Sequence, residues 1–288
     1  MKIGIGLPAT HPDAGPDVVL DWARRADAGP FSSVGIVDRL LYDSMESLVT
    51  LSAAAASTTR VRLLTALIVA PLRSTGLLAK QTATIQRISH GRLSLGVGVG
   101  TREDDFLAEE MPYHHRGARL DGQLEALRRV WTGGAFSEEA GPIGPSLAGM
   151  SPPELLIGGR SAKAVSRVGL WADGYLGSPV APETLAGVYD LAVESWRANG
   201  RHGKPRLVGT AYFSLGERAS EHPAAYVDHY YTWISGSARD RMIGNVLATP
   251  ERIREGMDLY ESIGMDELLL LPTDYHVEQL ELLAELVR

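Results

Sequence analysis

Eight short apolar runs alternate with segments of helical periodicity along this 288-residue chain, and this alternation predicts a (β/α)8 (TIM) barrel. Each run has the length and composition of a strand that is buried on both faces. Eight such units in a chain of this length favour a closed barrel over the alternative, a doubly wound open sheet, because no phosphate-binding fingerprint follows the first run. We therefore expect one barrel domain over residues 1–288.

The expected strands are short apolar runs bounded by Gly, Pro or polar residues. The first, KIGIGLP, ends at Pro8, and the third, VRLLTALIV, ends before Pro71. The eight expected strands are residues 2–8, 33–37, 61–69, 93–97, 154–157, 174–176, 206–215 and 267–271.

Helices are expected wherever apolar residues recur at helical spacing between these strands. Pro16 and Asp17 suit a first helical turn, because Pro lacks an amide hydrogen and Asp faces the positive end of the helix dipole. Residues 133–153 are rich in Gly and Pro without periodicity and predict an irregular surface excursion. The expected helices are residues 16–28, 48–57, 75–88, 119–131, 162–170, 182–199, 221–234, 249–263 and 277–287.

Composition excludes several classes of function. The formal net charge is -7 and no basic block is present, which argues against nucleic acid as a partner. The chain has no Cys, so disulfides, thiolate catalysis and Cys-ligated metals are excluded. The adjacent histidines at 114–115 are not accompanied by carboxylates at the spacing of a metal site, and we expect no metal site. No apolar run has the length of a membrane span and no signal-peptide pattern opens the chain, so we expect a cytoplasmic protein without membrane contact.

The run LSLGVGVG, from Leu93 to Gly100, places glycines at alternate positions. Two explanations stay open for Gly98 and its neighbours: close approach of a flat ligand, or close packing inside the barrel. The spacing is not that of a dinucleotide fingerprint, and residues 101–105 are expected to form a polar loop.

Active sites of such barrels lie at the carboxyl ends of the strands, which selects a short set of residues. Gly158, Gly159, Arg160 and Ser161 stand between a strand and a helix, where unpaired amide groups and the helix dipole favour an anion. We expect a phosphate clamp there, and the alternative is a tight turn with a Ser cap. The rule also selects residues 177–178.

Asp38 and Arg39 adjoin at the end of another strand. They are expected either to form a surface ion pair or to place Arg39 against an anion of a substrate or cofactor. Residues 113–116, which include Tyr, His and Arg, could line a pocket. The aromatic residues between Tyr226 and Trp233 are expected to serve helix packing.

The chain resembles the bacterial luciferase-like monooxygenase family, which includes enzymes that use FMN and enzymes that use coenzyme F-420. The matching segments include KIGIGLP, SVGIVDR, LSAAAASTTR, LLTALIVAPLRS, LLAKQTATIQRISHGRLSLGVGVG, RGARLDGQLEALRRVWTG, PELLIGGRSAKAVSRVGLWADGYL and TPERIREGMDLYESIGMDELLLL.

The resemblance implies a (β/α)8 barrel with the flavin ring at the strand ends. It implies a non-prolyl cis peptide at Ala66–Leu67 under the ring, a phosphate held by residues 158–161, and Asp38 near the ring. The chain departs from bacterial luciferase at Arg39, where that enzyme has a catalytic His, and at Val99, where it has a phosphate-binding Arg. These differences argue against light emission and against the same phosphate geometry.

The activity that the resemblance implies is a monooxygenase reaction that uses reduced FMN and O2 on a small organic substrate. One alternative is hydride transfer with coenzyme F-420, and another is a non-catalytic flavin-binding protein. The resemblance also implies a separate flavin or deazaflavin reductase that supplies the reduced cofactor, and a homodimer.

Overall fold

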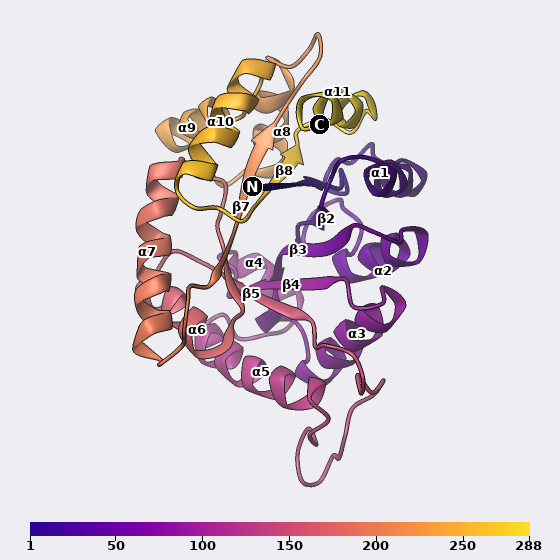
Figure 1. Cartoon of the computed structure of the whole chain (residues 1–288), viewed down its shortest axis with the longest axis vertical. Coiled ribbons are helices and arrows are strands. Elements are labelled where there is room, and N and C mark those ends of the chain that lie inside the picture. Colours follow the sequence, from indigo (N-terminus) through magenta and orange to yellow (C-terminus); the bar gives the residue numbers. More distant parts are fainter.

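The computed structural model describes residues 1–288 as a closed barrel in which eight parallel strands are hydrogen-bonded in chain order. The strands lie at the centre and most of the helices surround them (Figure 1). The strands are β1 (Lys2–Gly6), β2 (Ser33–Ile36), β3 (Arg62–Val69), β4 (Leu93–Gly98), β5 (Glu154–Gly158), β6 (Gly174–Leu176), β7 (Arg206–Phe213) and β8 (Glu267–Pro272). The predicted barrel and its eight strands are confirmed.

Helices connect the strands on the outside of the barrel, as the periodicity predicts. None of them combines the length and the apolar character that crossing a bilayer requires. The helices are α1 (Pro16–Ala28), α2 (Ser47–Ser57), α3 (Thr75–Ile88), α4 (Glu103–Ala108), α5 (Arg116–Trp131), α6 (Ala162–Trp171), α7 (Pro182–Ala198), α8 (His222–Tyr230), α9 (Gly236–Gly244), α10 (Pro250–Ser262) and α11 (Glu278–Leu286), and a 3-10 turn occupies Ala70–Leu72.

Three sequence expectations about the helices were wrong. The expected polar loop at residues 101–105 runs into α4, because three acidic residues lie in its first turn, where the helix dipole favours negative charge, and Phe106 is buried. The sequence did not predict α9, which buries no residue and therefore has no apolar face to recognise. The helix expected over 221–234 ends at Tyr230, and the chain then crosses the mouth of the barrel.

The alternating glycines of β4 are explained by packing inside the barrel. A Cβ on Gly96 would overlap the carbonyl oxygen of Thr65 and would lie 2.6 Å from Cδ2 of Leu176. A Cβ on Gly98 would lie 3.0 Å from both Cδ atoms of Leu67. Neighbouring strands and side chains therefore fill the space that these residues leave, which supports the close-packing explanation.

The amino-terminal end of the barrel is closed by charged side chains. Arg206 donates to Oε2 of Glu154 at 2.6 Å and also pairs with Glu267, whose Oε1 accepts from the hydroxyl of Ser33 at 2.6 Å. Burial alone would raise the pKa of Glu154, but Arg206, Ser94 and Arg62 hold that pKa below its ordinary value. This network ties β2, β5, β7 and β8 together and leaves the opposite end for the site.

Replacing Gly96 with Ala should destabilise the barrel by about 2–4 kcal/mol, because the new methyl group has no space and backbone must move. Gly122→Ala is the matched control, since a Cβ on this glycine of α5 meets nothing within 4 Å. It should stabilise the helix by about 0.5–1 kcal/mol. Chemical denaturation of both variants measures the difference, and equal stabilities would contradict the packing explanation.

Candidate active site

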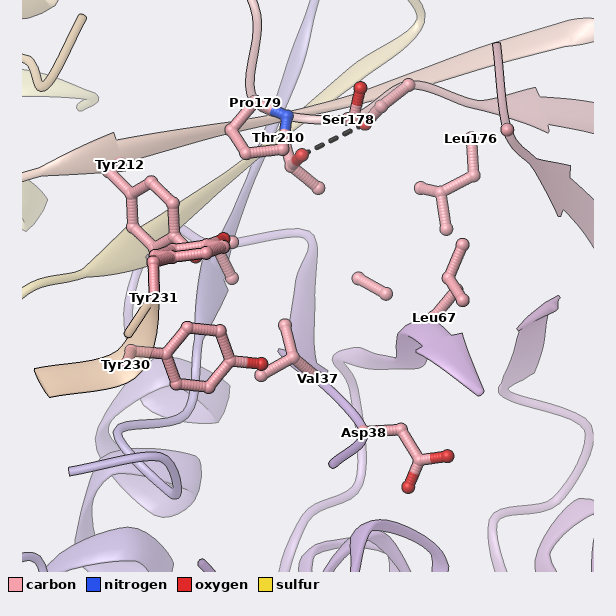
Figure 2. A pocket seen from close by; sticks show the side chains of 14 residues that line it. Val37, Asp38, Leu67, Leu176, Ser178, Pro179, Thr210, Tyr212, Tyr230 and Tyr231 are labelled. Carbon is pink, nitrogen blue, oxygen red and sulfur yellow. Dashed lines mark hydrogen bonds between the residues drawn. The ribbon is translucent and has the colours of Figure 1, made fainter. Parts of the chain in front are cut away.

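Two adjoining cavities open at the carboxyl ends of the strands, with volumes of about 200 and 250 Å³. Small-molecule sites usually occupy roughly 300–1,000 Å³, a range that the two reach only together. The first cavity is lined by Val37, Asp38, Ala66, Leu67, Gly159, Leu176, Gly177, Ser178, Pro179, Thr210, Tyr212, Tyr230, Tyr231 and Leu271 (Figure 2). The second is lined by Asp38, Arg39, Leu67, Val69, Gly98, Val99, Gly100, Thr101, Arg102, Asp105, Phe106, Gly158, Gly159, Tyr230, Tyr231 and Trp233.

Leu67 lies between the two cavities and borders both. Its side chain packs over two glycines, because a Cβ on Gly158 would lie 2.5 Å from Cδ2 of Leu67 and one on Gly98 would lie 3.0 Å away. The Ala66–Leu67 peptide bond is cis, as predicted, and the register of β3 against β4 shifts between Thr65 and Ile68. The strand end therefore presents Ala66 and Leu67 to the cavities.

Asp38, at the end of β2, holds neighbouring strand ends together. Its carboxylate accepts hydrogen bonds from the amide of Val69 at 3.0 Å, the hydroxyl of Ser47 at 2.8 Å and the guanidinium of Arg73 at 2.8 Å. Burial lowers the pKa of Arg73, but Asp38 and Glu46 more than compensate and raise it. The ion pair expected between Asp38 and Arg39 is not formed, because Arg73 takes the place of Arg39.

Arg39 lies instead in a cage of aromatic rings. Its guanidinium carbon is 4.7 Å from the ring centre of Trp233 and 5.1 Å from that of Tyr230. Only 8% of the Arg39 side chain is exposed, and its Nε is 3.8 Å from the carboxylate of Asp105. Arg102 stacks on the same Trp233 at 4.3 Å and reaches the same carboxylate at 3.8 Å. Two guanidinium groups therefore share one buried carboxylate beside the second cavity.

Tyr212 of β7, Tyr230 of α8 and the following Tyr231 form one wall of the first cavity, and Tyr226 packs against this wall without lining the cavity. Tyr226 and Tyr230 are stacked with their ring centres 5.5 Å apart, and the hydroxyls of Tyr212 and Tyr231 are 2.7 Å from each other. Burial raises the pKa of all four hydroxyls above the ordinary value, so this wall is uncharged at neutral pH. The interpretation of these rings as helix packing was incomplete, because the chain turns across the cavities after Tyr230.

The anion site predicted from the sequence falls at the turn from β5 into α6. Gly159 has a φ of 121°, a conformation that favours glycine, and a Cβ there would lie 2.7 Å from Cβ of Ala164. The amides of Gly159, Arg160, Ser161 and Lys163 donate no hydrogen bond within the chain. The hydroxyl of Ser161 caps the helix by accepting from the amide of Ala164 at 3.2 Å.

The residues at these strand ends suit an anionic cofactor with a flat ring. Unpaired amides at a helix start attract a phosphate, and the helix dipole adds to that attraction. Gly159 borders both cavities, so an anion on these amides would have its remaining atoms beside Leu67. Arg160 is exposed and available to the same anion.

The structure gathers most of the predicted site residues around these two cavities. Arg160 and Ser161 line neither cavity, although they follow Gly159, which lines both, and residues 113–116 line neither. There the guanidinium of Arg116 instead stacks on the ring of Tyr113 at 3.8 Å. The strand-end rule reached Arg102, but sequence reasoning missed Arg73 and Asp105, which lie just after a 3-10 turn and in the short helix α4.

Replacing Asp38 with Asn should destabilise the protein by roughly 2–4 kcal/mol, because Arg73 loses the negative charge of its buried partner. The NH2 group of the Asn side chain would also face hydrogen-bond donors that now donate to the carboxylate. Glu46→Gln is the control, since Glu46 also pairs with Arg73 but its side chain is 42% exposed. That change should cost less than about 1 kcal/mol. Thermal denaturation compares the two, and an Asp38→Asn variant as stable as the control would refute the structural role of this carboxylate.

Known proteins share this architecture. The chain is 30% identical over 211 residues to an uncharacterized protein of Mycobacterium tuberculosis, a match that covers 64% of this chain and 74% of the relative. Among solved structures, the monooxygenase RslO1 from Streptomyces bottropensis superposes with a TM-score of 0.82 at 23% identity, covering 99% of this chain and 98% of its own.

Two further solved structures differ in their cofactor. An F-420-dependent secondary alcohol dehydrogenase, in complex with an F-420–acetone adduct, has a TM-score of 0.79 at 17% identity and covers 100% of this chain and 99% of its own. The oxygenating constituent of 3,6-diketocamphane monooxygenase from Pseudomonas putida, in complex with FMN, has a TM-score of 0.73 at 16% identity and covers 100% of this chain and 96% of its own. At these identities the likeness concerns the fold.

The sequence profile described as "Luciferase-like monooxygenase" matches residues 1–285, which is nearly the whole chain. This family comprises oxidoreductases and monooxygenases that depend on a flavin or on coenzyme F-420. With its closed barrel and full-length match, the chain belongs to the luciferase-like monooxygenase family.

Proposed function

We propose that this protein is a monooxygenase that uses reduced FMN and O2 on a small organic substrate. The observation that carries the proposal is the group of unpaired amides at residues 159–163, which borders a pair of cavities at the strand ends. An FMN phosphate is the type of anion that such a helix start binds. When bound, reduced FMN supplies the electrons with which O2 oxygenates a substrate, and the protein supplies position and a dry pocket.

In this proposal the residues of the site bind the cofactor, shape the cavities and exclude water. The amides from Gly159 onward hold the phosphate, and Leu67 supports the ring. Asp38 keeps the ends of β2 and β3 in place through its bonds to Ser47, Val69 and Arg73, and thereby shapes both cavities. The tyrosine wall and the caged Arg39 cover the mouth and exclude water from it.

Hydride transfer with coenzyme F-420 is the second candidate. It is favoured by the likeness to the F-420-dependent secondary alcohol dehydrogenase. The phosphate-bearing tail of F-420 would use the same amides. A reductase that supplies the reduced cofactor, a homodimer and a cytoplasmic location remain part of the proposal.

Titration of the purified protein with FMN and with F-420, each oxidised and reduced, tests the two candidates. The monooxygenase proposal expects reduced FMN to bind and oxygen to be consumed together with a substrate. Tight binding of reduced F-420 without oxygen uptake would favour the second candidate. Failure to bind either cofactor would contradict both, and binding without turnover over a substrate panel would indicate a non-catalytic flavin-binding protein.

Removing the Ser161 hydroxyl should weaken cofactor binding about tenfold or more, since a hydrogen bond to a charged group contributes about 1.5–3 kcal/mol. Thr249→Ala is the matched control, because Ser161 and Thr249 each cap a helix by accepting an amide hydrogen bond at 3.2 Å. Both variants should lose about 1 kcal/mol of stability. Only Ser161→Ala should reduce affinity in a fluorescence titration, and equal affinities in the two variants would argue against the phosphate site.

A further inference from the structure

The first cavity has no positive charge in its wall. Asp38 is the one charged residue among the 14 that line it. Its carboxylate is already bonded to Val69, Ser47 and Arg73, so it is not available to a cationic ligand. Arg73 compensates that carboxylate from outside the cavity, so the wall offers an anionic group no cation of its own. The second cavity differs, because Arg39 and Arg102 line it together with Asp38 and Asp105, so that cationic side chains are present there.

Most of the remaining wall of the first cavity is apolar, and the cavity has the size of a small ring. Tyr212, Tyr230 and Tyr231 stand on one side, with Leu67 and Leu176 opposite them (Figure 2). Its volume is about 200 Å³. An apolar protein cavity of about 150 Å³ is known to take up benzene. Flat rings pack well against tyrosine faces, so an aromatic or other ring compound suits this wall.

One polar group of this cavity lacks a partner. The hydroxyl oxygen of Ser178 is buried and makes no hydrogen bond. Three of the other hydroxyls are engaged: Thr210 donates to the carbonyl of Gly177 at 2.9 Å, and Tyr212 and Tyr231 bond to each other. A buried hydroxyl without a partner is unfavourable, and a rotation of the Ser178 side chain toward the cavity would let a hydroxyl or carbonyl group on a ligand satisfy it.

We infer that the first cavity binds an uncharged ring compound that carries a hydroxyl or carbonyl group, and that it excludes carboxylates and phosphates. The inference rests on the proposed function in one respect, namely that the cofactor occupies the second cavity, beside its two arginines and the start of α6. The substrate then lies against the tyrosines, with its polar group at Ser178.

Three ring-matched probes test the inference on cofactor-loaded protein by isothermal titration calorimetry at neutral pH. They are 4-methylphenol, which is neutral and has a hydroxyl, 1,4-dimethylbenzene, which lacks the hydroxyl, and 4-methylbenzoate, which is anionic. We expect 4-methylphenol to bind at least tenfold more tightly than 4-methylbenzoate. Equal or tighter binding of the anion, or no binding of the phenol, would overturn the inference.

Ser178→Ala should weaken 4-methylphenol binding about three- to tenfold and leave 1,4-dimethylbenzene binding unchanged. Ser214→Ala is the matched control, because the Ser214 hydroxyl is likewise buried without a partner but lies outside both cavities. An unchanged phenol affinity in Ser178→Ala would refute the role of this hydroxyl. Cofactor affinity is measured in the same samples. Loss of cofactor binding would count against the proposed function. Intact cofactor binding together with a preference for the anionic probe would overturn only the inference.

Discussion

The turn at Gly159 is the constraint on which the site depends. Its positive φ lets β5 end and α6 begin without an intervening loop, and this leaves the first amides of the helix without partners beside the cavities. A side chain at this position would press on Ala164. The hydroxyl of Tyr175 donates to the carbonyl of Gly159 at 3.1 Å and helps to fix the turn. The anion site that we propose is thus built from backbone, with few side chains committed to it.

The other residues at the mouth of the barrel are held in place by packing contacts and by interactions of charged groups. Leu67 packs over Gly98 and Gly158. The absence of a side chain at these two glycines therefore makes room for a side chain of β3 as well as for the space above it. Asp38 fixes the strand end that carries Val69. Arg39 and Arg102 hold Trp233 over the second cavity, while the first cavity keeps a wall without positive charge. The two cavities therefore differ in charge although they share Leu67 and two tyrosines.

Sequence reasoning reached the barrel and most of the site because both depend on local patterns. Apolar runs identify the strands, and the carboxyl-end rule then selects Asp38, Gly158 and Gly159 without any knowledge of contacts. The interaction partners of these site residues were predicted less well. Arg73 replaced Arg39 as the counter-ion of Asp38, because β3 pairs with β2 and brings Arg73, 35 residues away in the chain, beside Asp38. The short helix α9, with no buried residue, carries no pattern that a sequence could reveal.

The most direct test of the central claim compares each cofactor with its counterpart that lacks the phosphate-bearing tail: FMN with riboflavin, and F-420 with its deazaflavin core. If the amides after Gly159 hold the anion, the cofactor that binds should do so at least tenfold more tightly than its tail-free counterpart, since a charge-assisted hydrogen bond contributes about 1.5–3 kcal/mol. Equal affinities within the pair would show that the start of α6 does not hold the cofactor, and would contradict the account.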